Sequence, residues 1–134
     1  MKTKISLLFA ILLLLGCQQD QQTTASVSNE GMIKVTILYP NGEGKTFDMD
    51  YYANSHMPMV KSLLGDSLKM YAIDKGIAGG AADAPLPYLA IGYLYFDKLS
   101  AYQNSIAPHI EQIRGDVSNY TNIVPVIQIS EVLQ

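Results

Sequence analysis

Apolar and polar residues follow each other in patterns that predict four strands. The stretch MIKVTILYP, residues 32–40, alternates at every second residue, and Pro40 and an NGEG turn end it, which is typical of a strand. We expect three further strands in SLKMYAIDKG, in the almost wholly apolar YLAIGYLYF, and in NIVPVIQISEV. Together the four segments predict a sheet.

Two segments repeat their apolar residues at the spacing of a helix. The first begins after Asp48, which can cap a helix, and ends at Gly65, which can terminate one. Pro58 interrupts it, and a residue that precedes proline is disfavoured in the α region, so we expect this helix to stop and restart. The second helix covers DKLSAYQNSIAPHIEQIRGD, with Asp97 as its cap and Pro108 as an interruption.

The element order β-α-β-β-α-β predicts a ferredoxin-like α+β fold, with one antiparallel sheet and two helices on one face. The uncovered face of such a sheet should be polar. Both the third and the fourth strand nevertheless carry apolar side chains on both of their sides. No segment of 32–134 remains to cover the second face, so we expect an identical sheet from a partner chain to cover it, as a homodimeric barrel.

The first residues predict a targeting segment that is not part of the fold. Two lysines precede an apolar run, residues 5–15, that is too short to span a membrane comfortably. The run ends in LLGC, which matches the lipobox of bacterial lipoproteins. We therefore expect residues 1–16 to be a lipoprotein signal peptide and Cys17 to carry the lipid. An ordinary signal peptide with a coincidental cysteine is the alternative.

The segment after the cysteine, residues 17–31, is polar and without periodicity, which predicts a flexible tether between the membrane and the domain 32–134. The expected location is the bacterial cell envelope. Gln18, in place of an aspartate after the cysteine, favours the outer membrane, facing the periplasm, if the cell is Gram-negative.

Composition narrows the class of protein. Cys17 is the only cysteine, which excludes an intramolecular disulfide, a CxxC redox pair and a thiolate zinc site. The net charge is −3 and no basic patch is evident, so we expect no nucleic-acid partner. Nine tyrosines and no tryptophan suit a mostly apolar cleft whose hydroxyl groups contact a small oxygenated ligand.

Three stretches of the domain carry a recognisable pattern: FDMDYYANSHMPMV, YLYFDKLSAYQ and NYTNIVPVIQISEV. They resemble the EthD family of the dimeric α+β barrel superfamily, and the resemblance covers residues 32–134. It implies the barrel fold. Relatives on this barrel include cofactor-free lactone isomerases, quinone-forming monooxygenases, polyketide cyclases and dye-decolourising peroxidases, so the fold alone does not choose a reaction.

The function we expect is a lipid-anchored domain that performs cofactor-free acid–base chemistry, of isomerase or lyase type, on a small oxygenated and partly apolar molecule. Two alternatives stay open. One is a lipoprotein that binds a small molecule without converting it, and the other is a structural dimer at the envelope.

His56 is the first candidate catalytic residue, because it lies just before the predicted helix break. Such a break can turn the imidazole inwards, and a histidine with a pKa of about 6.5 can take and return a proton near neutral pH. The alternative is a histidine that binds a freed carbonyl and fixes the kink. The match to the His-x-Pro motif of the family supports the catalytic role.

Five further residues are candidates for the site. Tyr71 in the second strand could orient a ligand through its hydroxyl, or could simply be exposed. His109 follows the proline of the second helix, where the family commonly has a histidine, or it lies on the flank of that helix. Tyr51, Tyr52 and Met59 are candidate substrate contacts, although neighbouring helical residues point about 100° apart and one tyrosine should belong to the core.

We expect no metal and no other cofactor. The two histidines lie far apart, the domain has no cysteine, and no His-Glu zinc motif occurs. A haem peroxidase normally needs a larger domain than 32–134. Asp48 and Asp50 diverge at a helix start, where they suit the cap and the macrodipole. The small-residue loop 76–87 is expected to be either a flap over the cavity or a plain connector.

Overall fold

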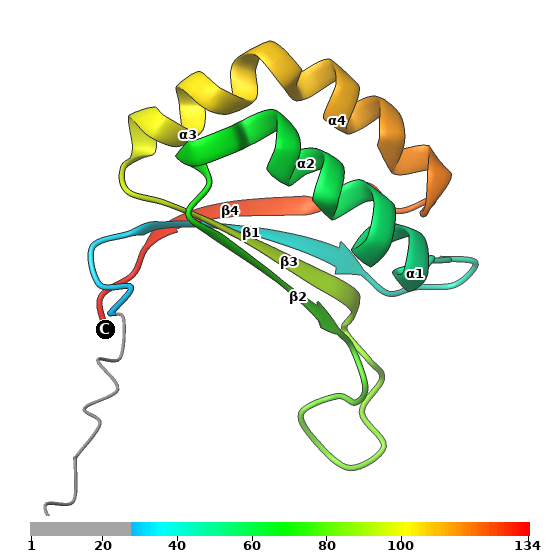
Figure 1. Ribbon diagram of the computed structural model, residues 1–134. Helices are drawn as coiled ribbons and strands as arrows, with labels where there is room; N and C mark the ends of the chain where they lie inside the picture. The colour runs from blue at the N-terminus through cyan, green and yellow to red at the C-terminus, as the bar shows by residue number, and fades with distance from the viewer. Residues whose placement is uncertain (1–27) are drawn as a thin grey trace, which may run out of the picture.

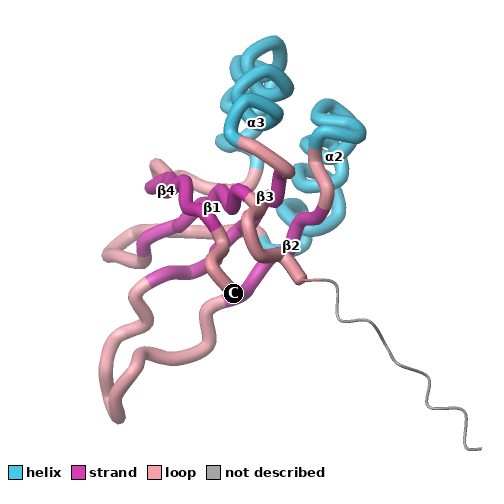
Figure 2. The backbone as a smooth tube through the Cα atoms, turned by 90° about the vertical axis from the view of Figure 1, so that its left-hand side faces the viewer, coloured by secondary structure: helices cyan, strands magenta, loops and turns pink. Residues whose placement is uncertain are grey.

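The computed structural model describes residues 28–134, which form one antiparallel sheet with the helices on one of its faces (Figures 1 and 2). The order of the strands in the sheet is β2-β3-β1-β4. The strands are β1 (Ile33–Pro40), β2 (Met70–Lys75), β3 (Tyr88–Phe96) and β4 (Val126–Glu131). The predicted ferredoxin-like order of elements is therefore confirmed.

The helical segments form two long units, one after β1 and one after β3. The first consists of α1 (Met49–Tyr51), a π turn (Tyr52–His56), α2 (Met57–Leu64) and a 3₁₀ turn (Gly65–Ser67). The second consists of α3 (Leu99–Ile106), a 3₁₀ turn (Ala107–His109), α4 (Ile110–Asp116) and a 3₁₀ turn (Val117–Asn119).

The core lies between the sheet and the first helical unit. On the sheet side, Val35 and Tyr39 of β1 and Phe96 of β3 are buried, and on the helix side so are Tyr52 and Val60. The register explains this pattern, because Val35 lies opposite Leu94 of β3 and Ile129 of β4 on the same face.

The first helical unit passes through Pro58 without stopping. The backbone N–H of Met57 donates to the carbonyl of Tyr52, five residues earlier, and Met57 has φ −66° and ψ −37°. The predicted break before Pro58 is therefore wrong. The π turn ends where α2 begins, so Pro58 falls in the first turn of α2, directly after the wider hydrogen-bond register of the π turn. The predicted ends are confirmed, because Asp48 caps α1 and Gly65 is the C-cap of α2.

The second helical unit differs from the prediction at its start. Lys98 occupies the N-cap position, with no side-chain cap, and the Asp97 carboxylate instead lies 3.2 Å from Nζ of Lys69. Asp97 as a helix cap is therefore wrong, because the helix begins one residue later. The 3₁₀ turn Ala107–His109 lies at the predicted Pro108 interruption. No residue of α3 or α4 is fully buried, because a cavity, described below, separates this unit from the sheet.

The sheet face opposite the helices is largely apolar. In the register, Leu38 of β1 lies between Ile91 of β3 and Val126 of β4. Val126 is 53% exposed and Met70 of β2 is 39% exposed. We call this face the outer face. Its apolar residues are Leu38, Met70, Leu89, Ile91, Tyr93, Tyr95 and Val126, and the register places Lys34, Thr36, Asp74, Gln128 and Ser130 on it as well.

Two segments are not part of the layered fold described above: the loop between β2 and β3, and residues 1–27, which the structure does not describe. The loop between β2 and β3 extends from the sheet on the side away from the helices (Figures 1 and 2), which supports a plain connector and not a flap. Residues 1–27 are not described, so the expected signal peptide, Cys17 and most of the tether 17–31 lie outside the described residues. Within 28–134, no helix has the length and apolar character needed to cross a membrane.

Candidate functional site

A cavity of about 410 Å³ lies between the sheet and the helices α2, α3 and α4. Its wall is mostly aliphatic, with contributions from β1, β3, both helical units and the segment around the start of β4. The side chains that bring polar atoms to it are His56, Tyr39, Tyr120, Tyr102 and Arg114. An apolar chamber with a few convergent polar groups is typical of a small-molecule site.

His56 forms one side of a hydrogen-bonded pair at the inner end of this cavity. Its Nδ1 lies 2.8 Å from Oδ2 of Asp116, and the residue is only 4% exposed. The other carboxylate oxygen accepts from the Tyr51 hydroxyl at 2.9 Å and from Nδ2 of Asn119 at 2.8 Å. Because an ionised carboxylate can only accept, Nδ1 of a neutral imidazole carries the proton and Nε2 is the basic nitrogen.

The charges of this pair follow from its surroundings. Burial lowers the pKa of His56 below its ordinary value, and the hydrogen bond to Asp116 only partly opposes this. Burial alone would raise the pKa of Asp116, but the hydrogen bonds from His56, Asn119 and Tyr51 outweigh it and hold the pKa below its usual range. At neutral pH the pair is therefore a neutral imidazole beside a carboxylate.

Two buried tyrosines lie next to the basic nitrogen. The hydroxyl oxygens of Tyr39 and Tyr120 are 2.8 Å apart, and that of Tyr120 is 3.4 Å from Nε2 of His56. Burial raises the pKa of both tyrosines above their ordinary value, so both stay protonated at neutral pH. Because one hydroxyl donates to the other, the two tyrosines leave one O–H to donate to a ligand or to Nε2 at this end of the cavity.

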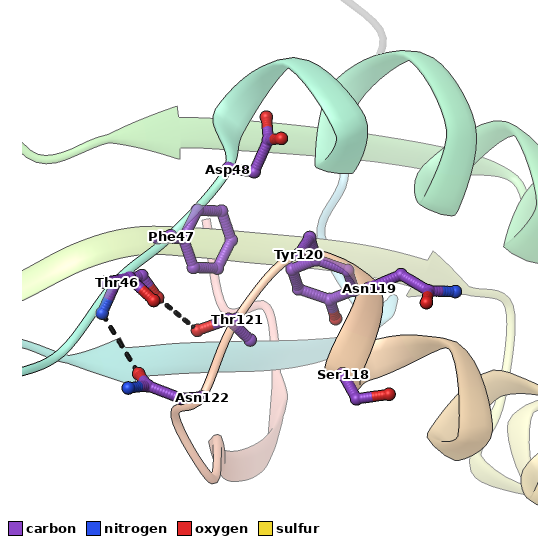
Figure 3. A pocket seen from close by; sticks show the side chains of 8 residues that line it. All are labelled: Thr46, Phe47, Asp48, Ser118, Asn119, Tyr120, Thr121 and Asn122. Carbon is purple, nitrogen blue, oxygen red and sulfur yellow. Dashed lines mark hydrogen bonds between the residues drawn. The ribbon is translucent and has the colours of Figure 1, made fainter.

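Tyr120 also lines a second, polar hollow of about 400 Å³ on the surface (Figure 3). There the backbone N–H of Thr46 donates to the side chain of Asn122 at 3.0 Å, and the hydroxyl of Thr121 donates to the carbonyl of Thr46 at 2.7 Å. Phe47 forms an isolated bridge with Thr121. These contacts tie the segment that carries Tyr120 to the chain just before α1.

The structure places the other candidate residues from the sequence analysis at three different locations. Tyr51 binds Asp116, whereas Tyr52 is fully buried, with its ring stacked on His56 at 5.5 Å between centroids. Tyr71 lines a hollow on the surface near Lys61 and Leu68, apart from the cavity. His109 and Met59 are half-buried and do not line the cavity.

Four residues of the site were missed by the sequence analysis: Asp116, Tyr39, Tyr120 and Met57. Asp116 lies 60 positions from His56, so no local spacing connects them. Met57, and not Met59, lines the cavity, because the π turn shifts the faces of the following helix. Within 28–134, no three His, Cys, Asp or Glu side chains gather in a group that could hold a metal ion.

Comparison with known proteins identifies similar domains. The model of the EthD domain matches residues 41–123, which include His56, Asp116 and Tyr120. None of the curated proteins matches this chain. The chain is similar to the crystal structure of an EthD-like protein from Ralstonia eutropha JMP134, with 44% sequence identity, a TM-score of 0.74, and coverage of 78% of this chain and 95% of the other.

Two more distant structures share the fold. One is an ethyl tert-butyl ether D (EthD) family protein from Bacillus halodurans C-125, with 18% identity, a TM-score of 0.60, and coverage of 76% of this chain and 99% of the other. The second is a dimeric protein of unknown function with a ferredoxin-like fold from Bacteroides fragilis NCTC 9343, with 10% identity, a TM-score of 0.50, and coverage of 77% and 98%.

The pair makes the pKa of His56 depend on Asp116. We expect Asp116→Asn to lower that pKa further, because it removes the carboxylate that stabilises the protonated imidazole. Titration of the His56 ring carbons by NMR measures this change. Asp50→Asn is the matched control, since Asp50 accepts from Asn54 and not from His56. An unchanged or raised pKa in Asp116→Asn would contradict the described pair.

Proposed function

The chain belongs to the EthD family, and on that premise we propose that it is a cofactor-free acid–base enzyme, of isomerase or lyase type, for a small oxygenated molecule. The observation that carries this proposal is the contact between Nδ1 of His56 and Asp116 at 2.8 Å. It leaves Nε2 as a base at the inner end of an apolar cavity of about 410 Å³.

The proposed reaction begins at a carbon next to a carbonyl group. Nε2 of His56 takes a proton from this carbon while the hydroxyl of Tyr120, which accepts from Tyr39, donates to the carbonyl oxygen, where negative charge develops. The carboxylate of Asp116 stabilises the imidazolium that forms. Return of the same proton to a different atom completes an isomerisation, and loss of a leaving group from the enolate completes an elimination.

A second candidate function is binding without conversion. It is favoured by the Tyr120 hydroxyl, which at 3.4 Å already approaches Nε2 of His56, so a ligand must compete with it for the base. A purely structural dimer is less well supported, because its cleft should be filled by its own side chains, and a cavity of about 410 Å³ is present.

Proton abstraction can be tested without knowing the substrate. We expect the protein to accelerate exchange of carbon-bound hydrogen for deuterium in members of a panel of small cyclic ketones and lactones in D₂O, followed by NMR. His56→Gln should lower the exchange rate by at least about 100-fold, the usual contribution of a general base. Tyr71→Phe, which lies apart from the cavity, is the control and should keep the rate.

The pH dependence has a definite sign. Because only the neutral imidazole accepts a proton and burial lowers the pKa of His56, the rate should be on its plateau at pH 7 and fall only below about pH 6.5. Binding of panel members in a 1:1 ratio without exchange, and unaffected by His56→Gln, would instead favour the non-catalytic alternative.

We further propose a homodimer that buries the outer face. Its support is the apolar character of that face, with Val126 53% exposed, and the similar fold of the Bacteroides fragilis protein that is described as dimeric. We expect native mass spectrometry at micromolar concentration to show a dimer, and Ile91→Asp on the outer face to give a monomer. Ile77→Asp in the exposed loop is the control. A monomeric wild type would exclude this dimer.

Attachment to the cell envelope through a lipid on Cys17 is a further part of the proposal. It rests on the signal-like run and the LLGC motif of the sequence. The full chain expressed in bacteria should incorporate labelled palmitate and partition into the detergent phase of Triton X-114, whereas Cys17→Ser should do neither. Equal partition of the two proteins would count against the anchor.

A further inference from the structure

The cavity has an inner end and a mouth of different chemistry. At the inner end, Tyr39 and His56 are almost completely buried, at 2% and 4% exposed. At the mouth, Val124 and Ile127 are 84% and 53% exposed, and Arg114 is exposed as well. A ligand that fills the cavity can therefore contact both the buried ring of His56 and the exposed guanidinium of Arg114.

Arg114 is the only arginine, lysine, aspartate or glutamate among the residues that line the cavity. Within residues 28–134, ion pairs form between His56 and Asp116 and between Lys69 and Asp97, and none involves Arg114. The guanidinium lies near the hydroxyl of Tyr102, whose pKa it lowers against the larger effect of burial. The rim of an otherwise aliphatic cavity thus presents one positive charge without an ionic partner in this part of the chain.

Close to His56, in contrast, a negatively charged ligand group is disfavoured. Asp116 lies behind His56 as an ionised carboxylate, so an anionic group placed beside His56 would be repelled. An anionic group at the mouth is instead attracted by Arg114. The charges therefore orient an elongated anion in one direction only.

We infer that the cavity takes an apolar molecule with a carboxylate at one end, which Arg114 binds at the mouth while the uncharged end lies beside His56. This inference rests on the proposed function for the reacting end and adds the substrate class. A single guanidinium matches a carboxylate through two parallel hydrogen bonds. A phosphate dianion would need further donors, and Arg114 is the only cationic side chain that lines the cavity, since His56 is neutral at pH 7.

The test compares two probes that differ only in charge, 4-phenylbutyrate and 4-phenylbutanamide. Their binding to the full chain in lipid nanodiscs is measured by calorimetry at pH 7, with empty nanodiscs as the blank. We expect the acid to bind at least about 10-fold more tightly than the amide, as is usual for a hydrogen bond to a charged group. Arg114→Gln should remove this preference, and Arg114→Lys should keep part of it.

Two control variants make the result specific. Lys61→Gln removes an exposed positive charge of α2 that does not line the cavity, and it should leave the preference unchanged. His56→Gln should also keep the preference, although it abolishes exchange. Because Arg114 is exposed and makes no ion pair in the described residues, Arg114→Gln should melt at the wild-type temperature.

Three results would overturn the inference: equal binding of acid and amide, an acid preference that persists in Arg114→Gln, or no detectable binding of the acid at millimolar concentration. None of these touches the proposed proton transfer, which is tested by exchange and by His56→Gln. Conversely, if the wild-type protein prefers the acid but does not accelerate exchange, the catalytic proposal is overturned and the proposed ligand class stands.

Discussion

The hydrogen bond between His56 and Asp116 is the contact on which the rest of the site depends. It joins the π turn of the first helical unit to the end of α4, across 60 positions of the sequence, and it occupies the ring nitrogen that faces away from the cavity. Tyr51 and Asn119 hold the carboxylate in place. A buried imidazole without this partner would cost about 1–3 kcal/mol, so the same contact that sets the tautomer also stabilises the arrangement of the helices.

The position of the second helical unit is a compromise between packing and function. Ile106, Ile110 and Ile113 form its apolar side, yet they line a cavity and do not close onto the sheet. Empty apolar volume forfeits contacts that a filled core would gain. On the other side of the sheet, apolar side chains are exposed as well. Both features cost stability, and the proposed ligand and the proposed second chain would supply the missing contacts.

The sequence predicted the fold better than the site, for a physical reason. The alternation of apolar and polar residues in strands and their helical spacing depend only on neighbouring positions in the sequence. These patterns located all four strands and both helical units. Pro58 was misread, because the penalty for proline in a helix applies to the hydrogen-bond register, and a π turn changes that register. Asp116 was missed because its partner is distant in sequence, and its local context is only that of a helix end. Tyr71 was chosen from its position within a strand, but which part of the sheet a helix covers is a tertiary property.

The π turn Tyr52–His56 has a consequence for the length of the chain. It contains one residue more than an α-helical frame requires, and each helical residue turns the helix by about 100°. Loss of one residue here would restore a regular α-helix and rotate Tyr52 relative to Met57, so that only one of them could remain in the core. Relatives that keep the pair of His56 and Asp116 should therefore keep the number of residues between Asp48 and Pro58. The segment is constrained in its length as well as at the positions that contact the pair and the core.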